Sequence, residues 1–201
     1  MRKLRIVLWI LVALALVGFA WLQLNRPEPG PRMEVRPDPD ATVSFGGPFE
    51  LVDSAGKPFP SSRLAGRPYA IFFGFTHCPD VCPTTLSDLV RYREQLGGEK
   101  AFDIVFVSVD PARDGPEEVG RYTELFGSPI IGLTGSEAQV EQAKEQFGIV
   151  ARKEGDGDNY DVAHTANVFL MDRSGEFVAT IATEEGRDAA IAKLERIALA
   201  R

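Results

Sequence analysis

The chain has 201 residues, of which 44% are hydrophobic, and its 22 basic and 29 acidic side chains give a formal net charge of −7. This length allows one domain of about 150 residues with extensions. A domain of that size can bury an adequate core without disulfides, so we expect the two cysteines to serve chemistry. The acidity argues against nucleic acid and anionic lipid as partners.

The N-terminus predicts a membrane anchor. Three basic residues precede an uncharged apolar run over residues 6–22, and with two further residues this run is long enough to cross a bilayer core of about 30 Å. The positive-inside rule puts the N-terminus in the cytoplasm. A cleaved signal peptide is the alternative, but Gly18-Phe19-Ala20 followed by Trp21 is a poor cleavage site. We therefore assign residues 1–24 to a single-pass signal anchor in a bacterial inner membrane, with the soluble domain on the periplasmic side.

Residues 25–45 are rich in proline and charge and predict an extended tether. From residue 46 onward the pattern becomes that of a compact α/β domain. A hairpin is expected over residues 49–59 around a turn at 53–56. Residues 69–75 form a continuous apolar run, which indicates a strand buried on both faces. Its three phenylalanines, Phe72, Phe73 and Phe75, are expected to belong to the core.

The next elements alternate between helix and strand. Pro83 suits the first turn of a helix, because its φ is fixed and it lacks an N–H, and this helix extends to about Leu96. We expect strands over 102–109 and 130–133, with a helix over 116–126 between them. Ser136 and Gln139 form a capping box for a helix that ends near Gly148.

Strands over 168–171 and 177–181 flank a turn, and an amphipathic helix over 187–199 closes the chain. This order of elements predicts an α/β fold of the thioredoxin-like kind, in which helices flank a central sheet. The domain spans residues 46–201. The two cysteines then lie between the first parallel strand and its helix, where that fold places its active site.

The most informative segment is Gly74-Phe75-Thr76-His77-Cys78-Pro79-Asp80-Val81-Cys82-Pro83, which holds both cysteines of the chain. Such a close pair either cycles between dithiol and disulfide or binds a soft metal. Both lie near the start of a helix, where unpaired N–H groups favour thiolate over thiol.

His164 directly precedes the strand expected near residue 167. Thioredoxins place a cis-proline about there, facing the cysteines, whereas this chain has no proline after Pro129. We therefore expect His164 to meet the two sulfurs. Two thiolates and an imidazole suit one copper ion per chain, as Cu(I) or Cu(II). Zinc prefers four ligands and is disfavoured, although an aspartate could complete such a site. His77 is expected to point away from a shared metal.

Four segments resemble the Sco/SenC family: residues 74–83, 107–114, 132–135 and 164–165. The resemblance covers roughly residues 46–200. It implies a membrane-anchored, thioredoxin-like copper protein with Cys78, Cys82 and His164 as ligands. It further implies a role in assembling the binuclear copper centre of cytochrome c oxidase subunit II. The protein would either deliver copper or reduce the cysteine disulfide of that target, with a periplasmic copper donor or thiol reductant as a further partner.

One departure from the family and one charged pair are relevant to the site. Many members carry an acidic residue directly before the histidine, where this chain has Ala163, and Asp161 could substitute if the segment is extended. Asp110 and Arg113 end the second parallel strand and are expected on the same side as the cysteine loop. They either support the site or a partner, or simply form an ion pair that holds the turn.

Competing functions are less consistent with the sequence. A peroxiredoxin needs Pro and Thr seven and three residues before its reactive cysteine, but Ile71 and Phe75 stand there for Cys78, and Phe75 and Pro79 for Cys82. A general Cys-x-x-Cys oxidoreductase is closer, although here three residues separate the cysteines. A dedicated thiol-disulfide reductase of one partner therefore stays open, as does the question of whether the protein is an enzyme. A copper sensor is a third class, but no DNA-binding or kinase-like segment supports it.

Overall fold

The computed structural model describes residues 45–155, 157 and 160–199, together with Trp9 and Trp21. The predicted anchor and tether lie outside the described residues, apart from the two tryptophans and Phe45. Within the described part of the chain, no helix combines the length and the apolar character needed to cross a membrane. The folded domain belongs to the unit Val43–Arg201.

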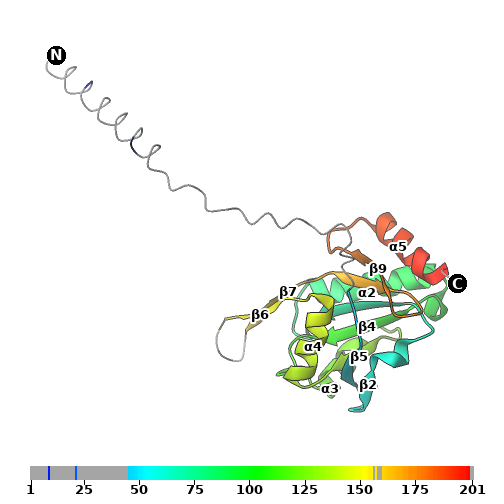
Figure 1. Ribbon diagram of the computed structural model, residues 1–201, viewed down its shortest axis with the longest axis horizontal. Helices are drawn as coiled ribbons and strands as arrows, with labels where there is room; N and C mark the ends of the chain where they lie inside the picture. Colours follow the sequence, from blue (N-terminus) through cyan, green and yellow to red (C-terminus); the bar gives the residue numbers. More distant parts are fainter. Residues whose placement is uncertain (1–8, 10–20, 22–44, 156, 158–159, 200–201) are drawn as a thin grey trace. The chain divides into compact units, whose positions relative to one another are not determined.

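A seven-stranded mixed sheet forms the centre of the domain (Figure 1), with the strand order β2-β1-β5-β4-β3-β8-β9. The strands β3, β4 and β5 are parallel, β8 runs antiparallel to β3, and β9 pairs antiparallel with β8. The bounds of the strands are Glu50–Asp53 (β1), Pro58–Pro60 (β2), Tyr69–Gly74 (β3), Asp103–Ser108 (β4), Ile131–Thr134 (β5), Val168–Met171 (β8) and Phe177–Ile181 (β9).

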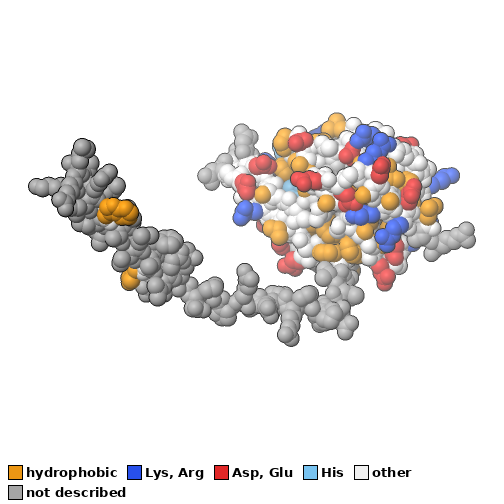
Figure 2. Space-filling model, turned by 90° about the horizontal axis from the view of Figure 1, so that it is seen from above, with side chains coloured by type: hydrophobic (Ala, Val, Ile, Leu, Met, Phe, Trp, Pro, Cys, Tyr) orange, Lys and Arg blue, Asp and Glu red, His pale blue; other side chains and the backbone are white. Residues whose placement is uncertain are grey.

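Helices flank this sheet, which confirms the predicted α/β architecture. The helices are α2 (Val81–Gln95), α3 (Pro116–Glu124), α4 (Glu137–Phe147) and α5 (Arg187–Leu199), with short 3-10 turns η1 (Ser61–Leu64) and η2 (Gly98–Lys100). On the face shown in Figure 2, acidic and basic side chains are interspersed over the surface of the domain.

The core lies on both faces of β3, as expected from its apolar run, and every residue of this strand is buried. On one face, Phe72 lies 6.4 Å from Phe106 between ring centroids, and Phe106 lies 5.2 Å from Tyr122 of α3. On the other face, the ring of Phe73 lies 5.1 Å from that of Phe147 at the end of α4. Packing on both faces fixes the carboxyl end of β3, from which the cysteine loop begins.

α2 begins at Val81, two residues before the predicted start. Pro83 is tolerated inside the first turn because the N–H groups there have no partner within the helix. The buried residues of α2 include Cys82, Leu86 and Leu89, which lie on one stripe at helical spacing. This stripe draws Cys82 into the core. In α4, the predicted capping box of Ser136 and Gln139 is present.

A second, two-stranded sheet was not expected. β6 (Ala151–Glu154) and β7 (Asp161–His164) pair antiparallel, with Ala151 opposite His164. Three successive charged residues in β6 lack the alternation that identifies a strand in a sequence. The hairpin places His164 at the end of β7, just before β8, so its position before that strand is confirmed.

Candidate metal centre

The two cysteines meet at the start of α2. Cys82 is fully buried, whereas Cys78 is partly exposed in the preceding loop. The Cys82 N–H donates to the Cys78 Sγ at 3.4 Å, so the first turn of the helix already directs one backbone donor at a sulfur. Gly74 makes room for this arrangement, because a Cβ there would lie 2.8 Å from the Cys82 Sγ.

The loop that carries Cys78 is held by a buried carboxylate that the sequence analysis did not single out. Asp114 is fully buried and accepts hydrogen bonds from the Thr76 N–H at 2.8 Å, the Thr76 hydroxyl at 2.6 Å and the Ser108 hydroxyl at 2.6 Å. It thereby ties the cysteine loop to the end of β4. In the sequence, Asp114 stands out only as an acidic residue in the loop after an apolar strand, and this position does not identify its partners.

His164 approaches the cysteines from β7. Its Nε2 lies 3.6 Å from the Cys82 Sγ, and its Nδ1 lies 3.0 Å from the carbonyl oxygen of Thr165. The ring also packs edge-on against Phe75, with 5.7 Å between centroids. A carbonyl oxygen can only accept, so this geometry assigns the proton to Nδ1 and leaves the Nε2 lone pair facing the sulfur. Ring orientation of this kind is typical of metal-binding histidines.

Cys78, Cys82 and His164 form a group whose candidate ligand atoms all lie within 4.8 Å of one another. Among the residues that the structure describes, no further His, Cys, Asp or Glu joins this group. His77 lies outside it: its side chain is 53% exposed, and its Nδ1 lies 3.1 Å from the Thr76 hydroxyl and 3.5 Å from the Asp114 Oδ1. The structure therefore brings the three predicted residues together and turns His77 away.

We expected the start of the helix to stabilise the Cys82 thiolate, but the surroundings of Cys82 favour the protonated thiol. Burial raises the pKa of the Cys82 thiol, and the neighbouring Cys78 and the negative charge of Asp114 act in the same direction. The expectation of an activated thiolate was therefore wrong for Cys82 without a bound cation. A soft cation reverses this preference, because a coordinating thiol loses its proton.

A hollow of about 250 Å³ opens beside the group. Cys78 and His164 line it, whereas Cys82 does not, so an ion held by all three would be reached from this side. Other lining residues are Phe75, Pro79, Asp80, Val81, Asp161, Val162 and Ala166.

Asp161 does not replace the acidic residue that is missing at position 163. Its carboxylate accepts the Val162 N–H at 2.8 Å and is not the hydrogen-bond partner of the imidazole, although Asp161 also lines the hollow. The Thr165 carbonyl is the hydrogen-bond partner of the imidazole instead.

Asp110 and Arg113 form the expected ion pair, with the Nε of Arg113 2.6 Å from the Asp110 Oδ2. The interpretation that they hold a turn is confirmed. The pair also contacts Tyr160 next to β7, which the sequence did not indicate.

The comparisons with known proteins identify the family of this chain. A family model described as SCO1/SenC matches residues 37–199. The chain belongs to the SCO1/SenC family. A SCO2-like protein of Rickettsia conorii is 37% identical over 181 residues, which cover 88% of this chain and 87% of that protein.

Two solved Sco structures with copper bound share the thioredoxin-like fold of this chain. Bradyrhizobium japonicum ScoI is 38% identical, with a TM-score of 0.67, and the match covers 76% of this chain and 99% of that one. Yeast Sco1 is 32% identical, with a TM-score of 0.68, and the match covers 75% and 86% of the two chains. Homologous Sco proteins thus bind copper, and the three-residue group here could hold a metal ion.

Proposed function

We propose that this SCO1/SenC protein binds one copper ion through Cys78, Cys82 and His164 and delivers it to the binuclear copper centre of cytochrome c oxidase subunit II. The observation that carries the proposal is the convergence of two thiols and one imidazole within 4.8 Å. Soft thiolates select Cu(I), and one added imidazole gives a three-coordinate site that also accepts Cu(II). Zinc would need a fourth ligand.

The exposure of the ligands suits transfer of the ion. Cys78 and His164 line the open hollow, whereas Cys82 is buried behind them. Thiolates of an acceptor approach from the hollow and compete first for the ligands on that side. The buried Cys82 keeps hold of the ion until the acceptor has replaced the other two.

The N-terminal segment fits the same role. We propose that residues 1–24 anchor the protein in the inner membrane, residues 25–45 act as a tether, and residues 46–201 form the copper domain on the periplasmic side, where subunit II presents its copper site. In a bacterial host, the full chain is expected in the carbonate-washed membrane pellet. Alkaline phosphatase fused after residue 201 should be active there. Release of the full chain into the soluble fraction would overturn the anchor.

A second candidate function is reduction of the disulfide of the target, which the proximity of the two free thiols supports. The Cys78 thiol loses its proton and attacks one sulfur of the target disulfide, and the other sulfur leaves as a thiolate that takes up a proton. Cys82 then loses its proton, attacks the Cys78 sulfur and releases the second target thiol. Two electrons and two protons pass to the target. A periplasmic thiol reductant must then reduce the Cys78–Cys82 disulfide to restore the two thiols.

One experiment separates these functions. The reduced full-length protein in detergent is titrated anaerobically with Cu(I) against a chelator, and the loaded protein is then mixed with the copper-free soluble domain of subunit II. One tight site per chain, lost in Cys82→Ser, with copper moving to reduced subunit II, supports delivery. No tight site, with electrons moving to oxidised subunit II instead, overturns delivery and supports reduction.

A further inference from the structure

Three side chains connect the loop after β4 to the start of β7. The Tyr160 hydroxyl donates to the Asp110 Oδ1 at 2.6 Å, and the Arg113 Nε donates to the Asp110 Oδ2 at 2.6 Å. The Arg113 Nη1 also donates to the backbone carbonyl of Tyr160 at 2.9 Å. We refer to Asp110, Arg113 and Tyr160 as the hairpin clamp, because they join one end of the β6–β7 hairpin to the main sheet.

The hairpin clamp is partly shielded from water. Asp110 is buried, and the side chain of Arg113 is 17% exposed. The guanidinium carbon of Arg113 lies 3.6 Å from the centroid of the Tyr160 ring, and the Lys153 Nζ lies 3.8 Å from it. Hydrogen bonds to charged groups and cation–π contacts both strengthen when water is excluded. The hairpin clamp should therefore hold the start of β7 firmly to the loop after β4.

The β6–β7 hairpin depends on contacts of this kind for its stability. An isolated two-stranded sheet is marginally stable in water, and β6 and β7 pair only with each other among the described strands. A hollow of about 550 Å³ separates the hairpin from α4 and is lined by residues of both, including Lys144, Lys153 and Val162. Helix α4 therefore does not back the hairpin closely along this side.

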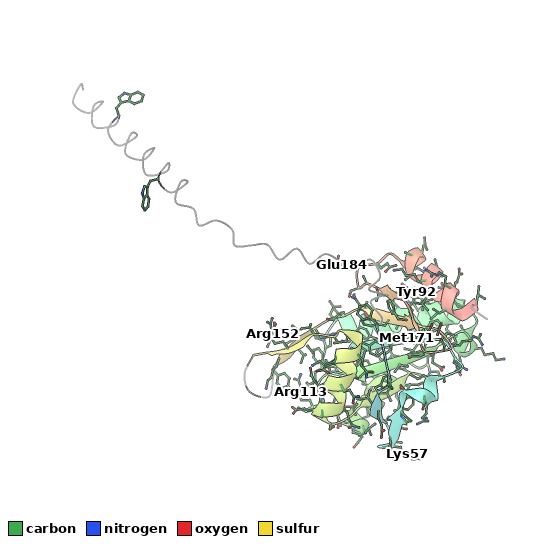
Figure 3. All side chains as sticks on the ribbon, in the orientation of Figure 1. Lys57, Tyr92, Arg113, Arg152, Met171 and Glu184 are labelled. Carbon is green, nitrogen blue, oxygen red and sulfur yellow. The ribbon has the colours of Figure 1, made fainter. Side chains whose placement is uncertain are left out.

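The position of Tyr160 gives the hairpin clamp its relation to the metal centre. Tyr160 directly precedes β7, and His164 is the last residue of that strand. Figure 3 shows Arg113 near the hairpin that carries Arg152. At the other end of the hairpin, the Val150 carbonyl accepts the Thr165 N–H at 2.9 Å. Without the Tyr160 contact, β7 would be held by this second attachment and by buried Val162, and the position of the imidazole would be less tightly fixed.

We propose that Tyr160 and Arg113 are positioning residues for the third metal ligand. Acting through Asp110, they hold β7 in place and keep the His164 Nε2 within reach of the Cys82 sulfur. The cysteine loop is positioned by Asp114 and the core, and Asp110 is linked to Asp114 through Ser108. Tyr160 makes no hydrogen bond to this loop among the described residues, so removing its hydroxyl should loosen His164 while the cysteine loop stays tied by Asp114. The inference rests on the proposed function only in naming copper as the ion.

The first test uses Tyr160→Phe in the full-length protein in detergent. This substitution removes the hydroxyl but keeps the ring that contacts Arg113 and Lys153. Loss of a group that orients a metal ligand typically lowers affinity by about 10- to 100-fold, and we expect a loss of Cu(I) affinity in that range. The thiolate-to-copper absorption of the Cu(II) form should also shift toward that of His164→Ala. Arg113→Lys keeps the positive charge but cannot bond Asp110 and the Tyr160 carbonyl at once, so it should also lower the Cu(I) affinity.

A second readout needs no metal. Backbone amides of residues 161–164 should exchange hydrogen faster in metal-free Tyr160→Phe than in the wild type, while those of β3 keep their wild-type rates. Tyr92→Phe, on α2 and outside the hairpin clamp, is the matched control and should change neither affinity nor exchange.

Wild-type affinity, absorption and exchange in Tyr160→Phe would overturn the inference, as would equal losses in Tyr92→Phe. If the wild type binds no Cu(I), the proposed function fails, and the exchange comparison alone decides the role of the hairpin clamp.

Discussion

The His164 Nε2 lies 3.6 Å from the Cys82 Sγ, although the two residues are 82 positions apart in the sequence. The sheet explains this proximity. β8 runs antiparallel to β3, with Val168 opposite Phe72. The chain that enters β8 therefore lies beside the carboxyl end of β3, where the cysteine loop begins. Any ligand placed a few residues before β8 meets this loop, and His164 occupies that place.

The first prediction compares the two histidines. His164→Ala removes a ligand and should weaken Cu(I) binding by at least about 100-fold, since losses of outer groups alone reach 10–100-fold. His77→Ala removes an exposed ring outside the group and should leave one copper per chain at wild-type affinity. Chelator competition measures both variants. Equal affinity of His164→Ala and the wild type would remove His164 from the ligand set.

The second prediction concerns the buried carboxylate of Asp114. Asp114→Ala leaves three donors, from Thr76 and Ser108, without their acceptor. Unsatisfied buried donors are costly, so we expect the free energy of unfolding to fall by about 3 kcal/mol. Urea unfolding of the metal-free protein measures this change.

Asp161→Ala is the control for Asp114→Ala, because among the described residues its exposed carboxylate accepts only the N–H of its neighbour Val162. It should change the free energy of unfolding by less than about 0.5 kcal/mol, as is usual for surface positions. A similar loss in both variants would show that Asp114 has no special structural role.

The sequence predicts those parts of the fold that depend on local pattern. β3 follows from its apolar run, α4 from the capping box of Ser136 and Gln139, and α5 from its periodicity. Both the position of His164 before β8 and its meeting with the cysteines also followed from the order of elements. In each of these cases, neighbouring residues carry the signal.

Other features depend on contacts between distant segments. Tyr160 reaches Asp110 across 50 positions, and Asp114 binds Thr76 across 38. No local pattern specifies such pairs. The helix terminus predicted a thiolate at Cys82, but burial by the surrounding core raises the pKa of that thiol. The β6–β7 hairpin escaped prediction because β6 is a run of charged residues that tertiary contacts hold in extended form.

The third prediction is a pH dependence of stability in the metal-free, reduced protein. An ordinary thiol has a pKa of about 8.5, and burial raises the pKa of Cys82 in the folded state. Below about pH 8.5 both states keep the proton, and above it only the unfolded state loses it. The free energy of unfolding should therefore fall as pH rises above about 8.5, by up to about 1.4 kcal/mol per pH unit.

Urea unfolding between pH 8 and 9.5 measures this slope. Higher pH is avoided because burial also raises the pKa of Tyr69, to about 12, so that its ionisation in the unfolded chain adds a similar slope. Cys82→Ala should lose the slope that Cys82 contributes. An unchanged slope in Cys82→Ala would assign the effect to another group.

The last prediction concerns the space beside Cys82. In Gly74→Ala, the added methyl group would lie 2.8 Å from the Cys82 Sγ and 3.0 Å from the rings of Phe72 and Phe106. The buried rings of Phe72 and Phe106 on this face of β3 leave little room for the methyl group, so we expect the free energy of unfolding to fall by about 1–3 kcal/mol. The displaced sulfur should also weaken Cu(I) binding. Gly186→Ala is the matched control, because a Cβ there meets no atom within 4 Å. Urea unfolding and chelator competition measure the stability and the Cu(I) affinity of both variants. If Gly74→Ala matches Gly186→Ala in both, tight packing does not hold Cys82 in place.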